Sequence, residues 1–277
     1  MSDVGNYIFD VQEKKERRRR YVRIGVLIGV VFAVLLVSAW FLFRAPFLRF
    51  STIAIIPNAL RAGEVSFDRR TSDAQVIDLL RGTMLKNGRG WLPIENFLAW
   101  PNVLEEKDLK FIPQLKRVTL QKKYWDDTLA VYVEERLPLG VWCFNKESPV
   151  ECFWFDDEGI IFEKTFEAEG SLLTVVHDYS HDPLPLLSPV LPERMLPALF
   201  SLFPTMKASG VAIKNIMLKD LDKEEIEIAT YDGPTLYFSL RFPADESREV
   251  VQALKREGEF QKLEYVDFRV PHRTYYK

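Results

Sequence analysis

The longest apolar run of the chain lies near its N-terminus. From Ile24 to Phe43 the sequence contains no charged residue, and Ser38 is the only clearly polar one. As an α-helix this run is about 30 Å long, which matches the hydrocarbon core of a bilayer. The pattern therefore predicts a single transmembrane helix, with nearly all of the remaining chain on one side of the membrane.

Basic residues are concentrated just before this run. The segment Lys14 to Arg20 is almost entirely basic and Arg23 follows it, whereas only Arg44 and Arg49 are basic just after the run. Because basic segments stay in the cytoplasm, we expect residues 1–23 inside and the C-terminal part outside. A cleaved signal peptide is the competing interpretation. However, its apolar core is usually about 7 to 15 residues long, and no small-x-small cleavage pattern follows here.

Further along, apolar positions predict a small α+β unit over residues 47–137. Phe47 to Ile56 suits a strand that leaves the membrane, and Ser72 with Gln75 forms a capping box that opens a helix. Two short helical pieces and two strands with a period of two follow. Their ranges are Ile94–Trp100, Leu104–Ile112, Val118–Gln121 and Leu129–Glu134. This order is typical of a unit with helices on one face of a sheet.

The remaining residues, 138–277, are richer in strands and predict a mixed β domain with an antiparallel sheet and two helices. One helical stripe runs from Met195 to Met206, and a second helix ends at Gly258. The expected strands are Val141–Phe144, Cys152–Phe155, Ile160–Glu163, Leu172–Val176, Val211–Leu218, Glu225–Thr230, Thr235–Phe242 and Tyr265–Val270. The predicted fold class is therefore α+β, and the last strand is expected at an edge of its sheet.

Charge argues against nucleic acid as a partner of the C-terminal part. Of the 37 basic and 40 acidic residues, residues 1–23 hold seven and four, so 30 and 36 remain and the net charge of the rest is −6. A mildly acidic surface does not suit a polyanion or an anionic membrane surface.

Cys143 and Cys152 are the two cysteines of the chain, and both lie outside the membrane in the predicted topology. They bracket a segment with Asn145, Ser148 and Pro149, which is typical of a hairpin loop. A cross-strand disulfide would stabilise this hairpin by roughly 2 to 3 kcal/mol in the loop-entropy model. Two buried thiols are the alternative, and the sequence leaves both open. A zinc site would need further ligands close by.

Three clusters contain residue types that enzymes use. His177 and His181 form a variant of a zinc-protease motif, but Pro183 follows too soon for the helix that this motif needs. The run Asp156 to Glu158 could serve glycoside hydrolysis, yet adjacent acids before a glycine are more typical of a turn. Cys143 lacks an oxyanion signature nearby. No P-loop or dinucleotide fingerprint occurs, so we expect no catalysis, metal or cofactor and interpret the C-terminal part as a binding protein.

Five segments form an ordered series of short motifs. They are Phe111–Lys116, Trp125, Leu129–Trp142 with Val133-x-Glu135-Arg136-x-Pro138, Phe155–Phe162 with Asp156-x-x-Gly159, and Tyr265–Arg269. The series resembles the FtsQ/DivIB family of bacterial cell-division proteins. In that family a Val-x-Glu-Arg-x-Pro strand joins a POTRA domain to a β domain, and an Asp-x-x-Gly hairpin and a C-terminal Tyr-Val-Asp-Leu-Arg strand follow. The resemblance covers essentially the whole chain.

The resemblance implies a non-enzymatic scaffold of the septal machinery. It predicts a cytoplasmic tail (1–23), a transmembrane helix (24–43), a POTRA domain (47–137) and a β domain (138–277). The protein is then expected in the cytoplasmic membrane at the division septum. Its expected partners are the bitopic proteins FtsB and FtsL and the septal peptidoglycan synthase complex.

Strand addition is the physical route to such partners. An edge strand carries free N–H and C=O groups with which a partner strand can pair, and the matching family strand is where FtsB is expected to add. The expected partner-binding residues are Asp267, Phe268, Arg269, Val270, Tyr275 and Tyr276. Local packing of the two tyrosines and an intradomain Asp267–Arg269 ion pair are the alternatives. Phe268→Glu is expected to leave the protein folded, and Phe50 to Ile56 is a second candidate surface.

Two other functions compete with the scaffold. A membrane-anchored cell-wall hydrolase would need a convergent pair of acids or a metal site, for which Asp156 and His177 are the candidates. A POTRA-bearing secretion or pilus component would have its partners elsewhere in the envelope, away from the septum.

Overall fold

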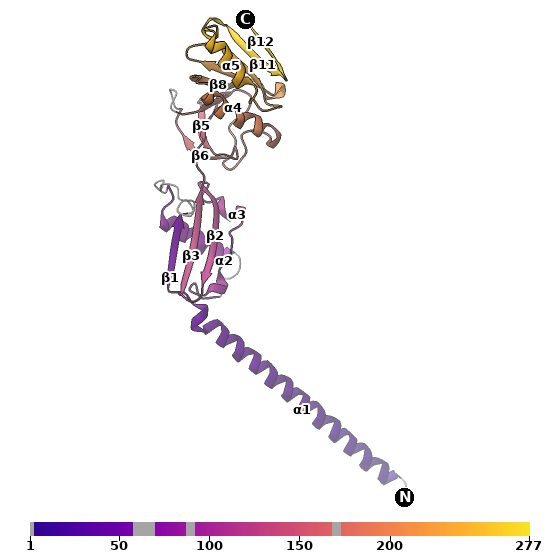
Figure 1. Cartoon of the computed structure of the whole chain (residues 1–277). Coiled ribbons are helices and arrows are strands. Elements are labelled where there is room, and N and C mark those ends of the chain that lie inside the picture. The colour runs from indigo at the N-terminus through magenta and orange to yellow at the C-terminus, as the bar shows by residue number, and fades with distance from the viewer. Residues whose placement is uncertain (1–2, 58–69, 87–91, 168–172) are drawn as a thin grey trace.

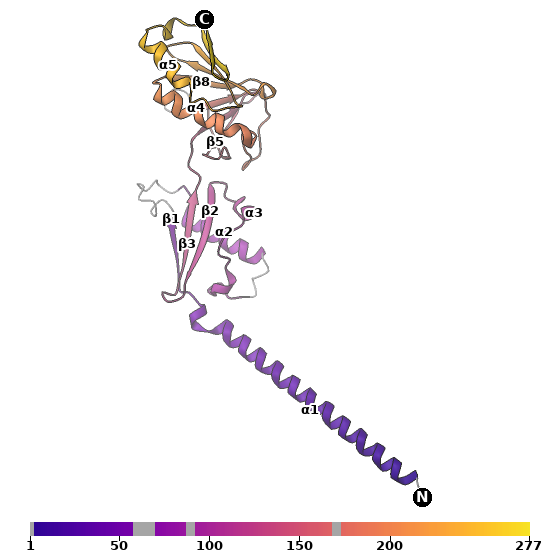
Figure 2. The ribbon, with the colours of Figure 1, turned by 45° about the vertical axis from the view of Figure 1, so that its right-hand side comes forward.

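The N-terminal helix α1 (Asp3–Arg44) is the longest element of the computed structural model, which describes residues 3–57, 70–86, 92–167 and 173–277. Its segment from Arg20 to Trp40 is long and apolar enough to cross a membrane, and it is not buried against the rest of the described chain. Both views show α1 projecting away from two folded units (Figure 1, Figure 2). An apolar helix without protein neighbours suits a lipid environment.

The first folded unit, residues 45–137, has a three-stranded sheet. Its elements are η1 (Pro46–Leu48), β1 (Thr52–Pro57), α2 (Asp73–Lys86), η3 (Phe97–Ala99), α3 (Glu106–Leu109), β2 (Leu115–Lys123) and β3 (Thr128–Glu135). The strand order is β1-β3-β2, with β1 parallel and β2 antiparallel to β3. Figure 2 shows α2 and α3 on the same side of this sheet, so the predicted order of strands and helices is present.

The capping box predicted at Ser72 forms at the start of α2. The N–H of Gln75 donates to Ser72 Oγ at 3.3 Å, and the N–H of Ser72 donates to Gln75 Oε1 at 2.9 Å. The two further helical pieces are shorter than predicted. In the first, Asn96 caps a single turn and Pro101 holds Trp100 in an extended conformation, which ends the turn.

Residues 138–277 form the second folded unit, built on a nine-stranded mixed sheet. Its strands are β4 (Gly140–Phe144), β5 (Glu151–Phe155), β6 (Ile161–Thr165), β7 (Val175–Asp178), β8 (Ile213–Leu218), β9 (Glu225–Thr230), β10 (Thr235–Ser239), β11 (Tyr265–Val270) and β12 (Arg273–Tyr276). Its helices are η4 (Glu193–Met195), α4 (Leu196–Ala208), η5 (Leu221–Lys223), α5 (Ser247–Arg256) and η6 (Phe260–Lys262). The predicted start of β7 at Leu172 lies outside the described residues.

The sheet order is β12-β11-β10-β9-β8-β7-β4-β5-β6. The prediction of an antiparallel sheet was incomplete, because the pairs β4–β7, β7–β8 and β10–β11 are parallel. Parallel neighbours need a crossover connection. The two predicted helices supply it for two of these pairs: α4 links β7 to β8, and α5 links β10 to β11. Side chains of both helices pack with the sheet into one large core.

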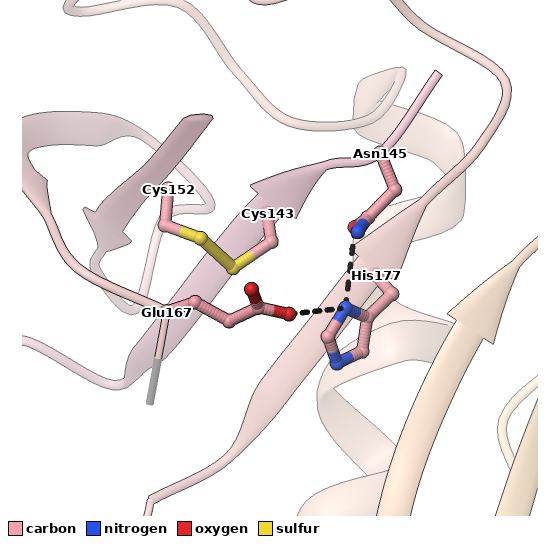
Figure 3. The surroundings of a disulfide bond; sticks show 5 residues. All are labelled: Cys143, Asn145, Cys152, Glu167 and His177. Carbon is pink, nitrogen blue, oxygen red and sulfur yellow. Dashed lines mark hydrogen bonds and ion pairs between the residues drawn. A yellow bond between two sulfur atoms is a disulfide. The ribbon is translucent and has the colours of Figure 1, made fainter. Parts of the chain in front are cut away.

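The other face of this sheet carries a small cluster around a disulfide. Cys143 on β4 lies directly opposite Cys152 on β5, and the two sulfur atoms are bonded. Of the two alternatives for these cysteines, the structure therefore has the disulfide. Figure 3 shows His177 beside it, with Nδ1 3.1 Å from Asn145 Oδ1. Burial lowers the pKa of His177 despite the nearby Glu167 carboxylate, so the imidazole is neutral at pH 7.

A buried carboxylate joins the two units. Asp156 follows β5 and is fully buried, and its Oδ1 accepts the N–H groups of Glu158 (3.0 Å) and Ile160 (2.9 Å). Its Oδ2 accepts a hydrogen bond from Arg136, directly after β3. Asp156 therefore shapes the β5–β6 turn of the second unit and at the same time binds the end of the first unit.

More exposed ion pairs surround this contact. Arg70 donates to Glu163 Oε2 at 3.1 Å, while its own N–H donates to Glu135 Oε2 at 3.1 Å. Lys116 Nζ lies 3.0 Å from Asp157 Oδ1. In each case a basic side chain of the first unit meets an acidic side chain of the second, so charge complementarity extends across the junction.

Replacing both cysteines, Cys143→Ala with Cys152→Ala, should lower the free energy of unfolding of the second unit. We expect a loss of about 2.5 kcal/mol, because the disulfide closes a short loop in the unfolded chain. Urea unfolding of the full chain in detergent micelles measures it. Reductant should shift the wild-type transition to that of the variant, and equal midpoints for the oxidised proteins would contradict the prediction.

Arg136→Ala should destabilise the chain by about 3 kcal/mol, because it leaves the Asp156 carboxylate buried without its cation. Lys116→Ala is the matched control. It removes an ion pair to the largely exposed Asp157, worth less than about 1 kcal/mol. The same urea titration compares the two variants. A loss at Arg136 no larger than that at Lys116 would show that the buried pair is not the principal contact.

Candidate protein-interaction surface

The last strand of the chain forms an edge of the nine-stranded sheet within the described residues. β12 pairs antiparallel with β11, on the side of β11 that faces away from β10. The expectation that Tyr265–Val270 is itself the edge strand was therefore wrong. A tight turn explains the difference: His272 has a left-handed backbone conformation (φ 58°), which reverses the chain soon after Val270.

The outer side of β12 presents backbone groups. The N–H of Lys277 donates to the Tyr265 carbonyl at 3.3 Å, and its own carbonyl accepts the N–H of Glu264 at 2.6 Å, so Lys277 faces β11. Because backbone groups alternate along an antiparallel strand, those of Thr274 and Tyr276 point away from β11. No described strand lies on that side. Such an edge is a template for an added strand.

Two tyrosines flank this edge. Tyr276 lies opposite Val266, and Tyr275 lies opposite Asp267. Since Val266 is part of the core beneath the helices, Tyr276 extends the helix-covered face and Tyr275 the open face. The exposed fractions are 48% for Tyr275 and 58% for Tyr276. Local packing therefore covers only about half of each side chain, and an added strand would meet an aromatic ring on either face.

The charged residues of β11 are paired inside the unit. Arg269 donates to Asp267 Oδ2 at 2.6 Å and to Glu225 Oε2 at 2.7 Å, and its guanidinium lies 5.1 Å from the centre of the Tyr237 ring. The hydrogen bond from Arg269 lowers the pKa of Asp267, and the same bond raises the pKa of Arg269. Both groups are therefore charged at neutral pH, in the intradomain ion pair that was the alternative to direct partner contact.

Phe268 belongs to the core and not to the surface. Only 7% of it is exposed, and its ring stacks on Phe238 with 5.0 Å between the centroids. The expectation that Phe268 is an exposed partner-binding residue was therefore wrong. Phe268→Glu is now expected to destabilise the second unit, because the new carboxylate would be buried without a partner. Val270 is 42% exposed and, with Phe268 and His272, lines a cavity of about 180 Å³ at the start of β12.

The second candidate surface, Phe50 to Ile56, corresponds largely to β1. Within the described residues β1 is also an edge strand, because it pairs only with β3. Phe50 is buried, and Ile53 and Ile55 pack on the core of the first unit. This edge therefore offers backbone groups with few large exposed side chains beside them.

The clusters weighed for catalysis have structural contacts. Asp178 is buried, accepts the indole N–H of Trp142 at 3.1 Å and contacts His181 Nδ1 at 2.8 Å. Cys143 has no free thiol, since it is in the disulfide. Throughout the described ranges, no group of three His, Cys, Asp or Glu residues is arranged to hold a metal ion. Asp156 is engaged in the junction between the units.

No model of a known protein family matches the chain, and no curated protein matches it at a significant level. The motif resemblance and the geometry of the β12 edge are thus the two grounds on which function can be argued.

Phe268→Ala should lower the free energy of unfolding of the second unit by about 3 to 4 kcal/mol, because it opens a cavity beside Phe238. Tyr276→Ala, at the exposed edge, should cost less than about 1 kcal/mol. Urea unfolding of the full chain in detergent micelles compares them. Similar losses in the two variants would contradict the assignment of one residue to the core and the other to the surface.

Proposed function

We propose that this protein is a bitopic membrane scaffold of the FtsQ/DivIB type, which binds an extended segment of a partner by strand addition to β12. The observation that carries the proposal is the outer edge of β12, on which no strand of the described residues lies, with Tyr275 and Tyr276 half exposed on its two faces. The expected partners are FtsB- and FtsL-like bitopic proteins, and the expected process is septal cell-wall synthesis.

The N-terminal part supports a membrane anchor. The segment Arg20–Trp40 can cross a bilayer by length and composition, and the basic run before it favours a cytoplasmic tail. The Cys143–Cys152 disulfide supports the same topology, because structural disulfides are typical of compartments outside the reducing cytosol. We therefore propose that both folded units lie on the outer face of the cytoplasmic membrane. Their expected location at the division septum rests on the motif resemblance alone.

The order of elements supports the proposed domain types. A strand, two helices and two strands, with sheet order β1-β3-β2, fit a POTRA-type domain, and the nine-stranded unit fits the β domain that follows it in the family. Two of the motifs that carry the resemblance also meet in space. Arg136 of the Glu-Arg-x-Pro signature binds Asp156 of the Asp-x-x-Gly hairpin, which gives both motifs a common physical role.

Strand addition explains how this surface would recognise a partner. The outward N–H and C=O groups of Thr274 and Tyr276 supply main-chain hydrogen bonds, and the tyrosines on either face select the alternating side chains of the added strand. Tyrosine suits this role, because it buries a large area with few rotatable bonds.

Thr274→Pro should weaken binding of an FtsB-like external segment at least tenfold, because it removes one outward N–H and blocks the approach of a strand. Tyr276→Ala should weaken it severalfold, and Tyr231→Ala, a similarly exposed tyrosine in the β9–β10 loop, is the matched control. Titration calorimetry of the full chain measures affinity, and a fluorescent fusion in dividing cells should be enriched at the septum. Unchanged binding in Thr274→Pro would remove β12 from the proposal, and uniform membrane fluorescence would remove the division assignment.

A further inference from the structure

Three loops meet at the end of the first unit where α1 enters it. The N–H groups of Ser51 and Thr52 donate to the Asp127 carbonyl, at 2.8 and 3.3 Å, in the β2–β3 turn. The N–H of Phe50 donates to the Glu95 carbonyl at 2.8 Å. The segment after α1, the loop around η3 and the β2–β3 turn therefore form one surface, which we call the hairpin-end surface. Both views show this end of the sheet beside the start of the unit (Figure 1, Figure 2).

This surface exposes large apolar side chains. Trp125, at the tip of the β2–β3 turn, is 100% exposed, and Phe47 in η1 is 56% exposed. Leu98 and Tyr124 are each 42% exposed. In contrast, Trp100 in the same unit is 1% exposed, and its indole N–H is bonded to the Ile94 carbonyl. A fully exposed tryptophan at a turn tip makes no contribution to the core of its own unit, and its ring is available for an external contact.

The hairpin-end surface lies close to the apolar part of α1. Phe47 follows the end of α1 at Arg44 by three residues, and Ser51, bonded to the β2–β3 turn, follows by seven. Even fully extended, seven residues reach only about 25 Å, and the turn η1 shortens that path. The polar interface region of a bilayer is about 5 to 8 Å deep on each side. The turn tip is thus tethered within reach of the interface that α1 would enter.

We infer that the hairpin-end surface docks on the interface of the bilayer that α1 spans, with Trp125 inserted among the lipid headgroups. The inference rests on the membrane anchor of the proposed function. Tryptophan and tyrosine concentrate at this depth, because the ring is apolar while its N–H or O–H remains hydrated. Basic and acidic residues both border the tip in the sequence, where Lys122 and Lys123 come before Trp125 and Asp126 and Asp127 follow it. The contact therefore depends on aromatic insertion more than on anionic lipid.

Fluorescence quenching by brominated lipid tests the contact. The full chain is placed in nanodiscs of phosphatidylcholine with plain or dibrominated acyl chains, and emission is compared for wild type, Trp125→Phe, Trp40→Phe and Trp154→Phe. Trp40 lies at the end of the apolar span and is the reference. Relative to wild type, the emission that bromine quenches should fall in Trp125→Phe by at least half as much as it falls in Trp40→Phe. Trp154→Phe, in the second unit, should lose almost none and is the matched control.

The variants separate failure of the docking from failure of the anchor. If emission assigned to Trp40 is quenched by bromine and that assigned to Trp125 is instead quenched by aqueous iodide, the anchor stands and the docking is overturned. If Trp125 is shielded from both quenchers, protein covers the tip, as in self-association, and lipid is overturned as the occupant. If Trp40 emission is also insensitive to bromine, the anchor itself fails, and with it the premise of the inference.

Discussion

The bond between Arg136 and Asp156 is the constraint on which the arrangement of the two units depends. The Asp156 carboxylate is fully buried, and burial of a charge is costly unless a cation and hydrogen-bond donors surround it. Two of those donors are N–H groups of its own hairpin, but the cation comes from the first unit. The two hydrophobic cores are separate clusters. The buried carboxylate of the β5–β6 hairpin therefore has its cation only when the second unit binds Arg136 at the end of β3.

The sheet order places this junction and the proposed partner-binding strand β12 at opposite edges of the nine-stranded sheet. The β5–β6 hairpin, which carries Asp156, lies at one edge of the nine-stranded sheet, and β12 lies at the other. The disulfide ties β4 to β5 next to the junction, so the hairpin is fixed to the body of the sheet. Six strands of the described sheet lie between the β5–β6 hairpin and β12, and Figure 1 shows β12 far from the first unit. The residues that hold the units together and those that would bind a partner cannot obstruct each other.

Patterns among neighbouring residues predicted most of the helices and strands. They could not predict contacts between residues that are far apart in the sequence. The period of two at Val118 and Leu129, the capping box at Ser72 and the glycine after α5 depend on neighbours in sequence, and each marks the predicted element. The sequence did not predict β12, because its four residues, Arg273–Tyr276, are too few to show a period of two. The burial of Phe268 follows from the same local signal, because Val266 and Phe268 alternate with Asp267 and Arg269 and so form one apolar face of β11. The family resemblance instead led to the expectation that Phe268 lies at a partner-binding edge. The role of Asp156 depends on Arg136, twenty residues away.

Taken together, the two ends of the molecule set the height at which a partner would be bound. The eight residues of β3 rise about 26 Å from the hairpin-end surface to the junction, and the nine strands of the second unit extend about 38 Å from β6 to β12. Figure 1 shows the two units following one another away from α1, so β12 lies on the order of 60 Å from the proposed lipid contact. An α-helix covers that height in about forty residues. A bitopic partner of the proposed kind would therefore have to carry its added strand on a long external stalk, so that stalk length would contribute to specificity alongside the two tyrosines.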